Sequence, residues 1–297
     1  MGEYDSSRTR VVPVFNALMN RDPTGRSWLP ILLKLGSRCS GRIEGVDPGS
    51  LISGHQRWWG DNERRLDPPK ALLRWLVQNL KRPASERLWG DGETKRNRER
   101  LVAQDSTTIG EALHLLEQGF KPRVRYVLEG QSRPDAYLET ESAILVVEGK
   151  RTERVPTTTT TWMPRRSQML RHLDAAWEVR KGKRVLGMMI VEGPGGADAE
   201  NPSEYWLEET DAQVKPEMLK DSLPHRTPEE RDTTEAAAKG TTIEIGRRVM
   251  ATPRLLRTLQ RTDFKGTLAL AYETDAKDPL PGAAESIGYL RGVLAAI

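Results

Sequence analysis

The sequence predicts an α/β protein, and two observations on its central segment support that fold class. Between residues 106 and 191 the hydrophobic pattern follows the order helix, three strands, helix, strand. The last run, residues 185–191, is almost continuously apolar, as in a strand that is buried on both faces. Helices and strands mixed in this way build a sheet with helical cover, so we expect one core with further segments on both sides.

The first helix of this core leads directly into its three strands. Thr108 and Glu111 have capping-box spacing at the start of the helix, which we expect to pack on the sheet. The strands are expected at residues 124–128, 136–139 and 144–150, with short polar segments between them. The apolar face of the helix consists of Ile109, Ala112, Leu113, Leu116 and Phe120.

The second helix begins after Pro164 and ends near Gly182, just before the strand at residues 185–191. A Thr-rich loop separates this helix from the preceding strand. Its apolar side chains recur at helical spacing, which indicates a face that packs on the sheet. They are Met169, Leu173, Ala176 and Trp177.

Three regions follow from these elements. Residues 1–104 are expected to be basic and mainly helical, with helices near residues 28–35 and 70–80. Residues 105–195 form the core, and residues 196–297 form an acidic α/β extension packed on it. In that extension, Thr227 and Glu230 form a capping box, and we expect a helix after Pro253, a strand at 268–272 and a helix at 284–297.

Composition restricts the class of protein. The chain has 297 residues, 37% of them hydrophobic, and a mean hydropathy of -0.61, which is typical of a soluble folded protein. The longest apolar runs are far shorter than the roughly 20 residues of a membrane helix. Cys39 is the single cysteine and the first ten residues lack an apolar signal segment, so we expect a cytoplasmic protein without disulfides.

Charge is distributed unevenly along the chain. Basic residues exceed acidic ones in residues 1–104, and the reverse holds in residues 196–297. The basic region includes the run Lys95, Arg96, Arg98 and Arg100. Such a division fits a polyanion bound on one side, and it fits an ordinary solvated surface equally well.

The residues most indicative of chemistry are Asp135 and the tripeptide Glu148-Gly149-Lys150. Glu148 and Lys150 project from the same face of the third strand, where burying them is costly unless each has a partner. Asp135 begins the neighbouring strand, so a hairpin would bring its carboxylate close to Glu148. Two adjacent carboxylates favour a cation between them, and oxygen ligands suit Mg²⁺. Lys150 would orient or activate a water molecule beside a phosphodiester.

This pattern resembles the PD-(D/E)XK nuclease superfamily, which has a restriction-endonuclease-like αβββαβ core. Its RecB-like branch has a Gly-x-x-x-His motif followed by Glu on the first helix, which Gly110, His114 and Glu117 resemble. It also has a Gln-x-x-x-Tyr motif on the second helix. Gln168 resembles the Gln of that motif, and His172 stands where Tyr is usual.

The resemblance implies a deoxyribonuclease with Mg²⁺ or Mn²⁺ as its cofactor, acting in bacterial or phage DNA processing, repair or defence. The implied catalytic residues are Asp135, Glu148, Lys150, Glu117 and Gln168. The implied metal ligands are Asp135, Glu148, Glu117 and Gly149. We favour Glu117 over Glu111 as a ligand because Glu111 fits the role of the capping acid.

Other functions are less favoured by the sequence. The four histidines show no zinc-ligand spacing, and neither a phosphate loop nor a serine-hydrolase elbow is present. The alternatives that stay open are a nucleic-acid-binding protein that keeps the fold without cutting and an interaction protein whose acidic region binds a partner. RNA as the substrate and a homodimer are also open.

Overall fold

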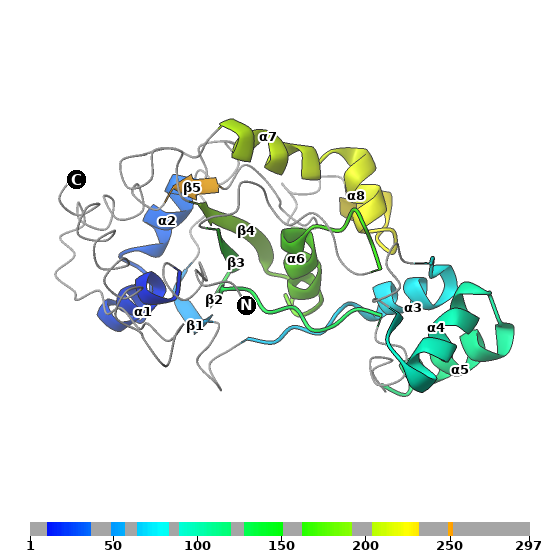
Figure 1. Cartoon of the computed structure of the whole chain (residues 1–297). Helices are drawn as coiled ribbons and strands as arrows, with labels where there is room; N and C mark the ends of the chain where they lie inside the picture. The colour runs from blue at the N-terminus through cyan, green and yellow to red at the C-terminus, as the bar shows by residue number, and fades with distance from the viewer. Residues whose placement is uncertain are drawn as a thin grey trace, which may run out of the picture.

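This computed structural model describes residues 11–36, 49–56, 64–82, 89–119, 128–150, 162–191, 204–231 and 249–251. It is an α/β structure with a mixed sheet at its centre and helices on both faces of that sheet (Figure 1). This confirms the predicted fold class. No helix in these ranges is long and apolar enough to cross a membrane.

The sheet has five strands in sequence order. Antiparallel pairing joins the first three strands, and parallel pairing joins the third to the fourth and the fourth to the fifth. A helix, α6 (Gln168–Glu178), makes the crossover between the parallel strands β3 and β4. The strands are β1 (Leu51–Gln56), β2 (Ala136–Thr140), β3 (Ala143–Lys150), β4 (Arg184–Val191) and β5 (Val249–Ala251).

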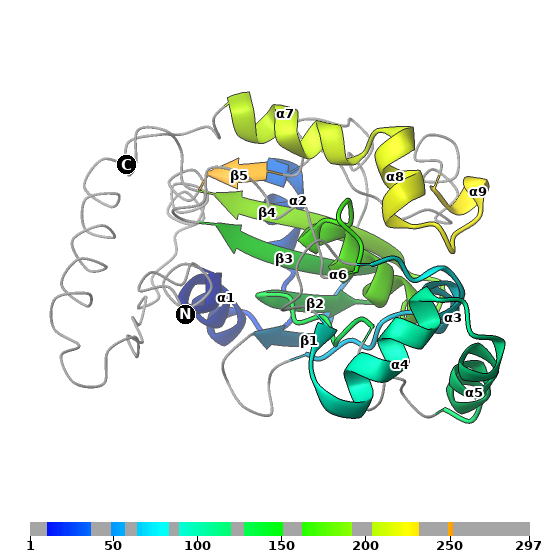
Figure 2. The ribbon, with the colours of Figure 1, turned by 45° about the vertical axis from the view of Figure 1, so that its right-hand side comes forward.

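Alternation along β3 divides the core into two apolar layers. Leu145 and Val147 face the layer that contains α1 (Val12–Arg21) and α2 (Leu29–Gly36). Ile144 and Val146 face the opposite layer, which α6 covers (Figure 2). Every described side chain of β3 is buried, because helices cover both faces of this central strand.

The contact between α6 and β4 depends on a glycine. A Cβ atom on Gly187 would stand 2.9 Å from Met169 Sδ and 3.0 Å from Leu173 Cδ1. The lack of a side chain at this position therefore allows the close approach of α6 to the sheet.

Three further helices form a separate unit at one side of the molecule. We call α3 (Lys70–Asn79), α4 (Gly92–Val102) and α5 (Ser106–Glu117) the helical unit; Figure 1 shows it at one side of the molecule, beyond α6. It has its own apolar core, built on residues such as Leu76, Leu101 and Leu116. An antiparallel bridge between Leu66 and Ser132 brings its two ends together, so the unit is an insertion between β1 and β2.

Two expectations about the start of the core are corrected. The helix at residues 106–117 packs in the helical unit, with α3 and α4, and not on the sheet. Its cap is Asp105, whose carboxylate accepts a hydrogen bond from the Thr108 amide at 2.8 Å, so the helix begins earlier than the spacing of Thr108 and Glu111 indicated.

The first strand of the sheet also differs from the prediction. Residues 124–127 lie outside the described residues, and Leu128 is not in a strand. β1 takes the place beside β2, and its pairing matches His55 to Tyr137. The sequence of β1 contains Ser53, Gly54 and His55 and lacks strong alternation, which is why we did not predict a strand there. Its place at the edge of the sheet requires backbone pairing on one side only.

The C-terminal segment contributes short helices near α6. They are α7 (Glu204–Gln213), α8 (Pro216–Ser222) and α9 (Pro228–Arg231). The predicted capping box is confirmed, since Glu230 N donates to Thr227 Oγ1 at 3.2 Å and Thr227 N donates to Glu230 Oε2 at 3.0 Å. The elements expected beyond Pro253 lie outside the described residues.

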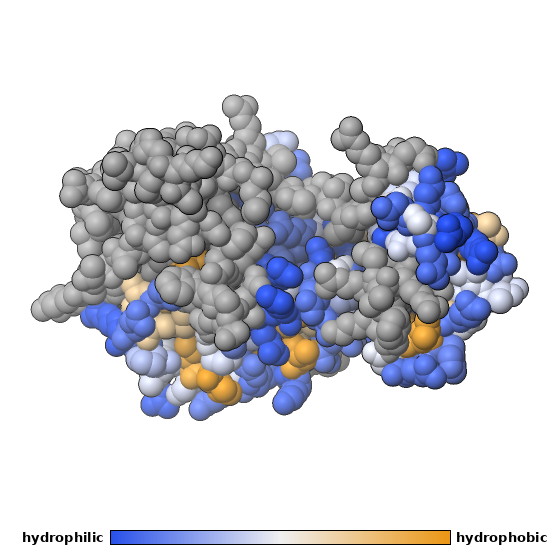
Figure 3. All heavy atoms as spheres, turned by 60° about the horizontal axis from the view of Figure 1, so that its bottom comes forward, coloured by the Kyte–Doolittle hydropathy of each residue, from blue (hydrophilic) through white to orange (hydrophobic). Residues whose placement is uncertain are grey.

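The surface of the described residues is mostly polar in the view of Figure 3, with apolar atoms in separate patches. Ile52 on β1 and Tyr205 on α7 are its exposed large apolar residues, at 60% and 50% exposure. Scattered apolar residues of this kind are normal on a protein surface.

Candidate active site

The hairpin of β2 and β3 places Asp135 opposite Glu148. Ala136 pairs with Val147, and continuing this antiparallel register by one residue sets the two carboxylates on the same face. Both side chains are buried. Asp135 Oδ2 accepts a hydrogen bond from the Gly149 amide at 2.8 Å, which fixes the aspartate against the end of β3.

Lys150 and Gln168 complete a polar group around Glu148. The ammonium of Lys150 lies 3.2 Å from Glu148 Oε1 and donates to Gln168 Oε1 at 2.9 Å. Gln168 Nε2 in turn donates to Glu148 Oε1 at 2.6 Å. The glutamine therefore contacts both charged residues and holds the orientation of each.

His172 lies one helical turn after Gln168 and contacts the other oxygen of Glu148. Its Nε2 is 3.1 Å from Glu148 Oε2, and its Nδ1 shares a hydrogen bond with Ser132 Oγ. A carboxylate only accepts, so Nε2 carries the proton, and in the neutral imidazole Nδ1 accepts from the Ser132 hydroxyl. All three side chains are buried.

These contacts keep Glu148 ionised. Burial favours the neutral acid, but the hydrogen bond from His172 and the charge of Lys150 outweigh it and lower the pKa of Glu148. A buried glutamate that stays charged is suited to bind a metal cation or to orient the ammonium of Lys150 beside it.

The local sequence explains why Gln168 and His172 reach this group. Ser167 caps α6 by accepting from the Leu170 amide at 3.2 Å, so Gln168 is the first residue of the helix. Residues four apart lie on one side of a helix, and that side faces the end of β3. Met169 and Leu173, on the adjacent face, anchor the helix to the sheet.

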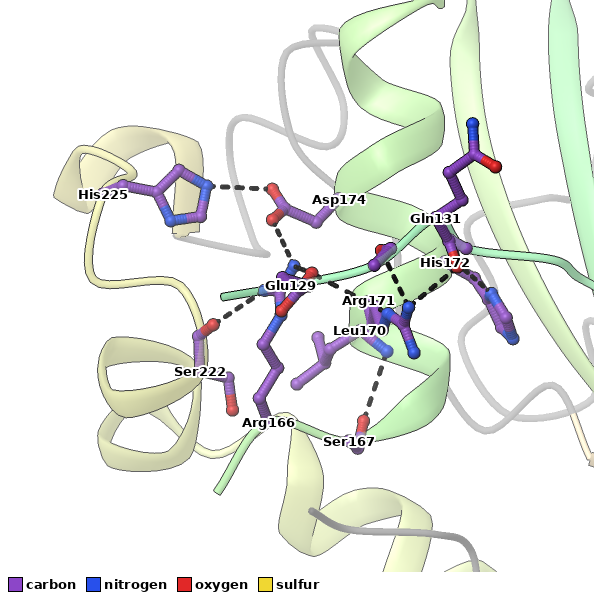
Figure 4. Close-up of polar contacts among 12 residues, drawn as sticks. Glu129, Gln131, Arg166, Ser167, Leu170, Arg171, His172, Asp174, Ser222 and His225 are labelled. Carbon is purple, nitrogen blue, oxygen red and sulfur yellow. Dashed lines mark hydrogen bonds and ion pairs between the residues drawn. The ribbon is translucent and has the colours of Figure 1, made fainter. Parts of the chain in front are cut away.

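A buried ionic network adjoins this end of α6 (Figure 4). Arg166, which is 0% exposed, donates to both carboxylate oxygens of Glu129, at 3.0 and 2.9 Å. It also donates to Asp174 Oδ2 at 2.8 Å and to the carbonyl of Ser222 at 2.9 Å. One guanidinium thus joins the segment before β2, helix α6 and the end of α8.

Asp174 is the acidic centre of the network. Arg226 Nε donates to its Oδ1 at 2.9 Å, and His225 Nε2 lies 3.2 Å from the same oxygen. Burial alone would favour the neutral acid, but Arg166, His225 and Arg226 together hold the pKa of Asp174 far below its usual range.

Arg171 connects α6 to the segment that carries Ser132. Its Nη2 donates to the carbonyls of Gly130 and Gln131, each at 2.8 Å (Figure 4). Because Ser132 directly follows Gln131, these two hydrogen bonds place its hydroxyl beside His172. The ionic network and the hydrogen bonds of Arg171 together position the residues around Glu148.

The structure brings together four of the predicted catalytic residues, Asp135, Glu148, Lys150 and Gln168. It does not bring Glu117 to them, which corrects that expectation. Glu117 is half exposed at the end of α5, where Lys70 donates to it at 2.7 Å and Arg74 forms a second ion pair. These two cations lower its pKa by hydrogen bonding, so the carboxylate already has partners within the helical unit.

Ser132 and the network around Arg166 were missed by sequence reasoning. His172 differs from the Tyr of the motif, but its spacing of four from Gln168 indicates that the two side chains share one side of the helix. No comparable sequence signal marks Ser132. It pairs with Leu66 and contacts His172, and both partners are distant from it in the sequence.

Comparison with protein-family models, with curated proteins and with solved structures gave no match to this chain.

Proposed function

We propose that this protein is a metal-dependent nuclease that hydrolyses phosphodiester bonds in DNA. The observation that supports this most directly is the group formed by Asp135, Glu148, Lys150 and Gln168, which two adjacent strands and the following helix bring together. Paired carboxylates with a lysine on one face of a sheet, at the ends of two inner strands, are suited to phosphoryl chemistry.

The order of the elements supports a restriction-endonuclease-like core. With α1 and β1 as its first members, and with α2 as an additional helix between them, the order α1, β1, β2, β3, α6, β4 is helix, three strands, helix, strand. The helical unit interrupts this order between β1 and β2. The first helix and strand of such a core then come from residues 12–56, well before the segment in which we expected them.

The donor set suits Mg²⁺ or Mn²⁺ in its chemistry. Asp135 and Glu148 supply carboxylate oxygens and Gly149 a carbonyl, which are the ligands that hard cations prefer. No three His, Cys, Asp or Glu side chains among the described residues are grouped as a metal site. The proposal therefore requires a cation to exchange with Lys150 for Glu148 Oε1, where the ammonium now lies.

Each residue of the group would have a distinct role. Asp135, Glu148 and the Gly149 carbonyl would hold the cation. A bound divalent cation polarises the phosphoryl oxygen and lowers the pKa of a water molecule. Lys150 would orient that water and neutralise charge on the phosphorane, Gln168 would hold Lys150, and His172 would fix Oε2 of Glu148.

The test is incubation of the full-length protein with circular and linear DNA, single- and double-stranded, in Mg²⁺, in Mn²⁺ and in EDTA. A parallel RNA substrate decides between the two nucleic acids. We expect cleavage of DNA with either metal and none in EDTA. Intact substrate under every metal condition, with folded protein, would contradict the proposal.

A non-cleaving nucleic-acid-binding protein is the second candidate, and one observation favours it. Both oxygens of Glu148 already have partners in Lys150, Gln168 and His172, so the group is complete without a cation. Binding of DNA with equal affinity in Mg²⁺ and in EDTA, without cleavage, would support this candidate.

A bacterial or phage setting, a homodimer and a partner for the acidic region stay proposals.

A further inference from the structure

A second polar pair lies beside the carboxylates, on the same face of the sheet. Tyr137 follows Asp135 by two residues, so their side chains project to one side, about 7 Å apart along β2. The segment before α3 crosses this face, because Leu66 packs in the same apolar cluster as Tyr137. That segment places the guanidinium of Arg64 over the Tyr137 ring, with 5.3 Å between Cζ and the ring centroid.

Arg64 and Tyr137 each keep a polar atom that is buried and without a hydrogen bond. These atoms are Arg64 Nε and Tyr137 Oη, and Tyr137 is only 1% exposed. A phenol is protonated at neutral pH, so Tyr137 keeps its O–H donor. Such donors cost stability unless an acceptor reaches them.

The chemistry of the pair selects the acceptor. A guanidinium N–H and a phenolic O–H both donate, and the fixed positive charge of Arg64 favours a negatively charged acceptor. Phosphate oxygens accept from Arg and Tyr in protein–DNA contacts. His55, whose ring centroid lies 6.1 Å from that of Tyr137, borders the same place on β1.

We propose that Arg64 and Tyr137 form a subsite for an anionic phosphate oxygen beside the carboxylate and lysine group. The inference rests on the proposed function, since it takes the ligand to be a backbone phosphate next to the one that is cleaved. The subsite fixes the DNA strand relative to Asp135 and Glu148, so it contributes to DNA binding more than to the chemical step.

The test measures binding of a fluorescein-labelled DNA duplex to the full-length protein in EDTA, where no cleavage occurs. Arg64→Gln should weaken binding about tenfold and reduce the log–log salt slope by about 0.9, because the variant no longer neutralises one phosphate. Tyr137→Phe should weaken binding severalfold with an unchanged slope, because the phenol carries no charge. Arg65→Gln is the control, since it removes the same charge from the exposed neighbouring position.

A second measurement does not depend on DNA. Inorganic phosphate should raise the thermal midpoint of the wild type and of Arg65→Gln, and raise that of Arg64→Gln much less. Sodium chloride at equal ionic strength separates phosphate binding from a general salt effect. An equal shift in Arg64→Gln and the wild type, or an equal shift with chloride and phosphate in the wild type, would overturn the subsite.

The two proposals fail in different ways. If the wild type cleaves DNA while Arg64→Gln and Tyr137→Phe bind DNA and phosphate as it does, the subsite is wrong and the nuclease stands. If the wild type never cleaves but phosphate protection still requires Arg64, the nuclease is wrong and an anion subsite remains.

Discussion

At the residue scale, the site depends on a few buried charges that neutralise one another. Glu148 is charged because Lys150 and His172 outweigh its burial. Asp174 is charged for the same reason, through Arg166, His225 and Arg226. Buried ions of this kind are costly to break, because removal of one partner leaves the other without compensation.

Substitution of the central residues should separate chemistry from folding. Asp135→Asn, Glu148→Gln and Lys150→Met should each reduce metal-dependent cleavage by at least about a hundredfold, since each removes a charge that the transition state needs. Single-turnover cleavage rates, with circular dichroism of each variant, provide the measurement.

Glu117→Gln is the matched control for these three variants. Because Glu117 pairs with Lys70 and Arg74 in the helical unit, the variant should cleave at the wild-type rate with a small change in stability. Loss of cleavage in Glu117→Gln alone would contradict this assignment of the site.

Asp174 should make stability depend on pH. Its folded pKa is depressed, so its stabilisation is complete above the unfolded value near 4 and is lost as the pH falls toward the folded pKa. Asp174→Asn should therefore cost about 3–5 kcal/mol at pH 7 and less at pH 3. Urea unfolding of both proteins at the two pH values measures this, and an equal cost at both would contradict it.

At the element scale, α6 is the part that assembles the site. Its first two turns carry Gln168 and His172, its apolar face lies on the sheet, and its remaining polar face joins the network of Figure 4. α8 takes part through Ser222, and the segment between α8 and α9 takes part through Arg226. The start of α6 is therefore held from three directions, which fixes the two side chains that contact Glu148.

The basic run on α4 separates into two kinds of residue. Arg98 is buried: it donates to the carbonyl of Trp89 at 2.6 Å and lies over the ring of Trp162 at 4.9 Å. Arg98 therefore stabilises the helical unit. This corrects the expectation that it contacts a polyanion with the rest of the basic run. Arg96 and Arg100 are exposed, and Lys95 makes only a loose ion pair with Glu99 at 3.9 Å.

Replacement of Lys95, Arg96 and Arg100 together by Gln should weaken DNA binding and lower the salt slope by about 0.9 for each phosphate that the variant no longer neutralises. Arg98→Met should lower the melting temperature and leave the slope unchanged, because its charge is not on the surface. Fluorescence anisotropy over a range of salt concentrations decides this. A flatter slope for Arg98→Met would put that residue back in the interface.

At the scale of the whole molecule, the chain builds two cores that share a boundary. The sheet layers and the helical unit have separate apolar clusters, and the segments next to the Leu66–Ser132 bridge join them. The sheet also includes β1, which belongs to the basic residues 1–104, so the boundary of the sheet region in the sequence does not coincide with the change in charge. Asp135 and Arg64 lie close to the Leu66–Ser132 bridge in the sequence.

Leu76→Ala should reveal whether the helical unit opens independently. Leu76 is buried in that unit, and its truncation should cost about 2–5 kcal/mol there. Hydrogen exchange should accelerate in α3 and α5 while β3 and β4 keep their protection. Equal acceleration in both parts would indicate a single cooperative unit.

Short-range sequence pattern is enough to specify the local elements around the site. The strands that carry Asp135 and Glu148, the helix that begins at Gln168 and the strand after it follow from short-range periodicity, and the hairpin register follows from a short connection. Local pattern is therefore enough to group Asp135 with Glu148 and Lys150, whereas the resemblance to the nuclease superfamily implied the place of Gln168.

Long-range packing, in contrast, selects the distant segments that complete the core. β1 is short and polar, and its strand character comes from pairing with β2 across an insertion of about eighty residues. The apolar face of α5 has the same period whether it packs on a sheet or on α3, so the sequence could not place Glu117. Ser132, Arg64 and Arg166 each reach their contacts through long-range packing, which no local pattern encodes.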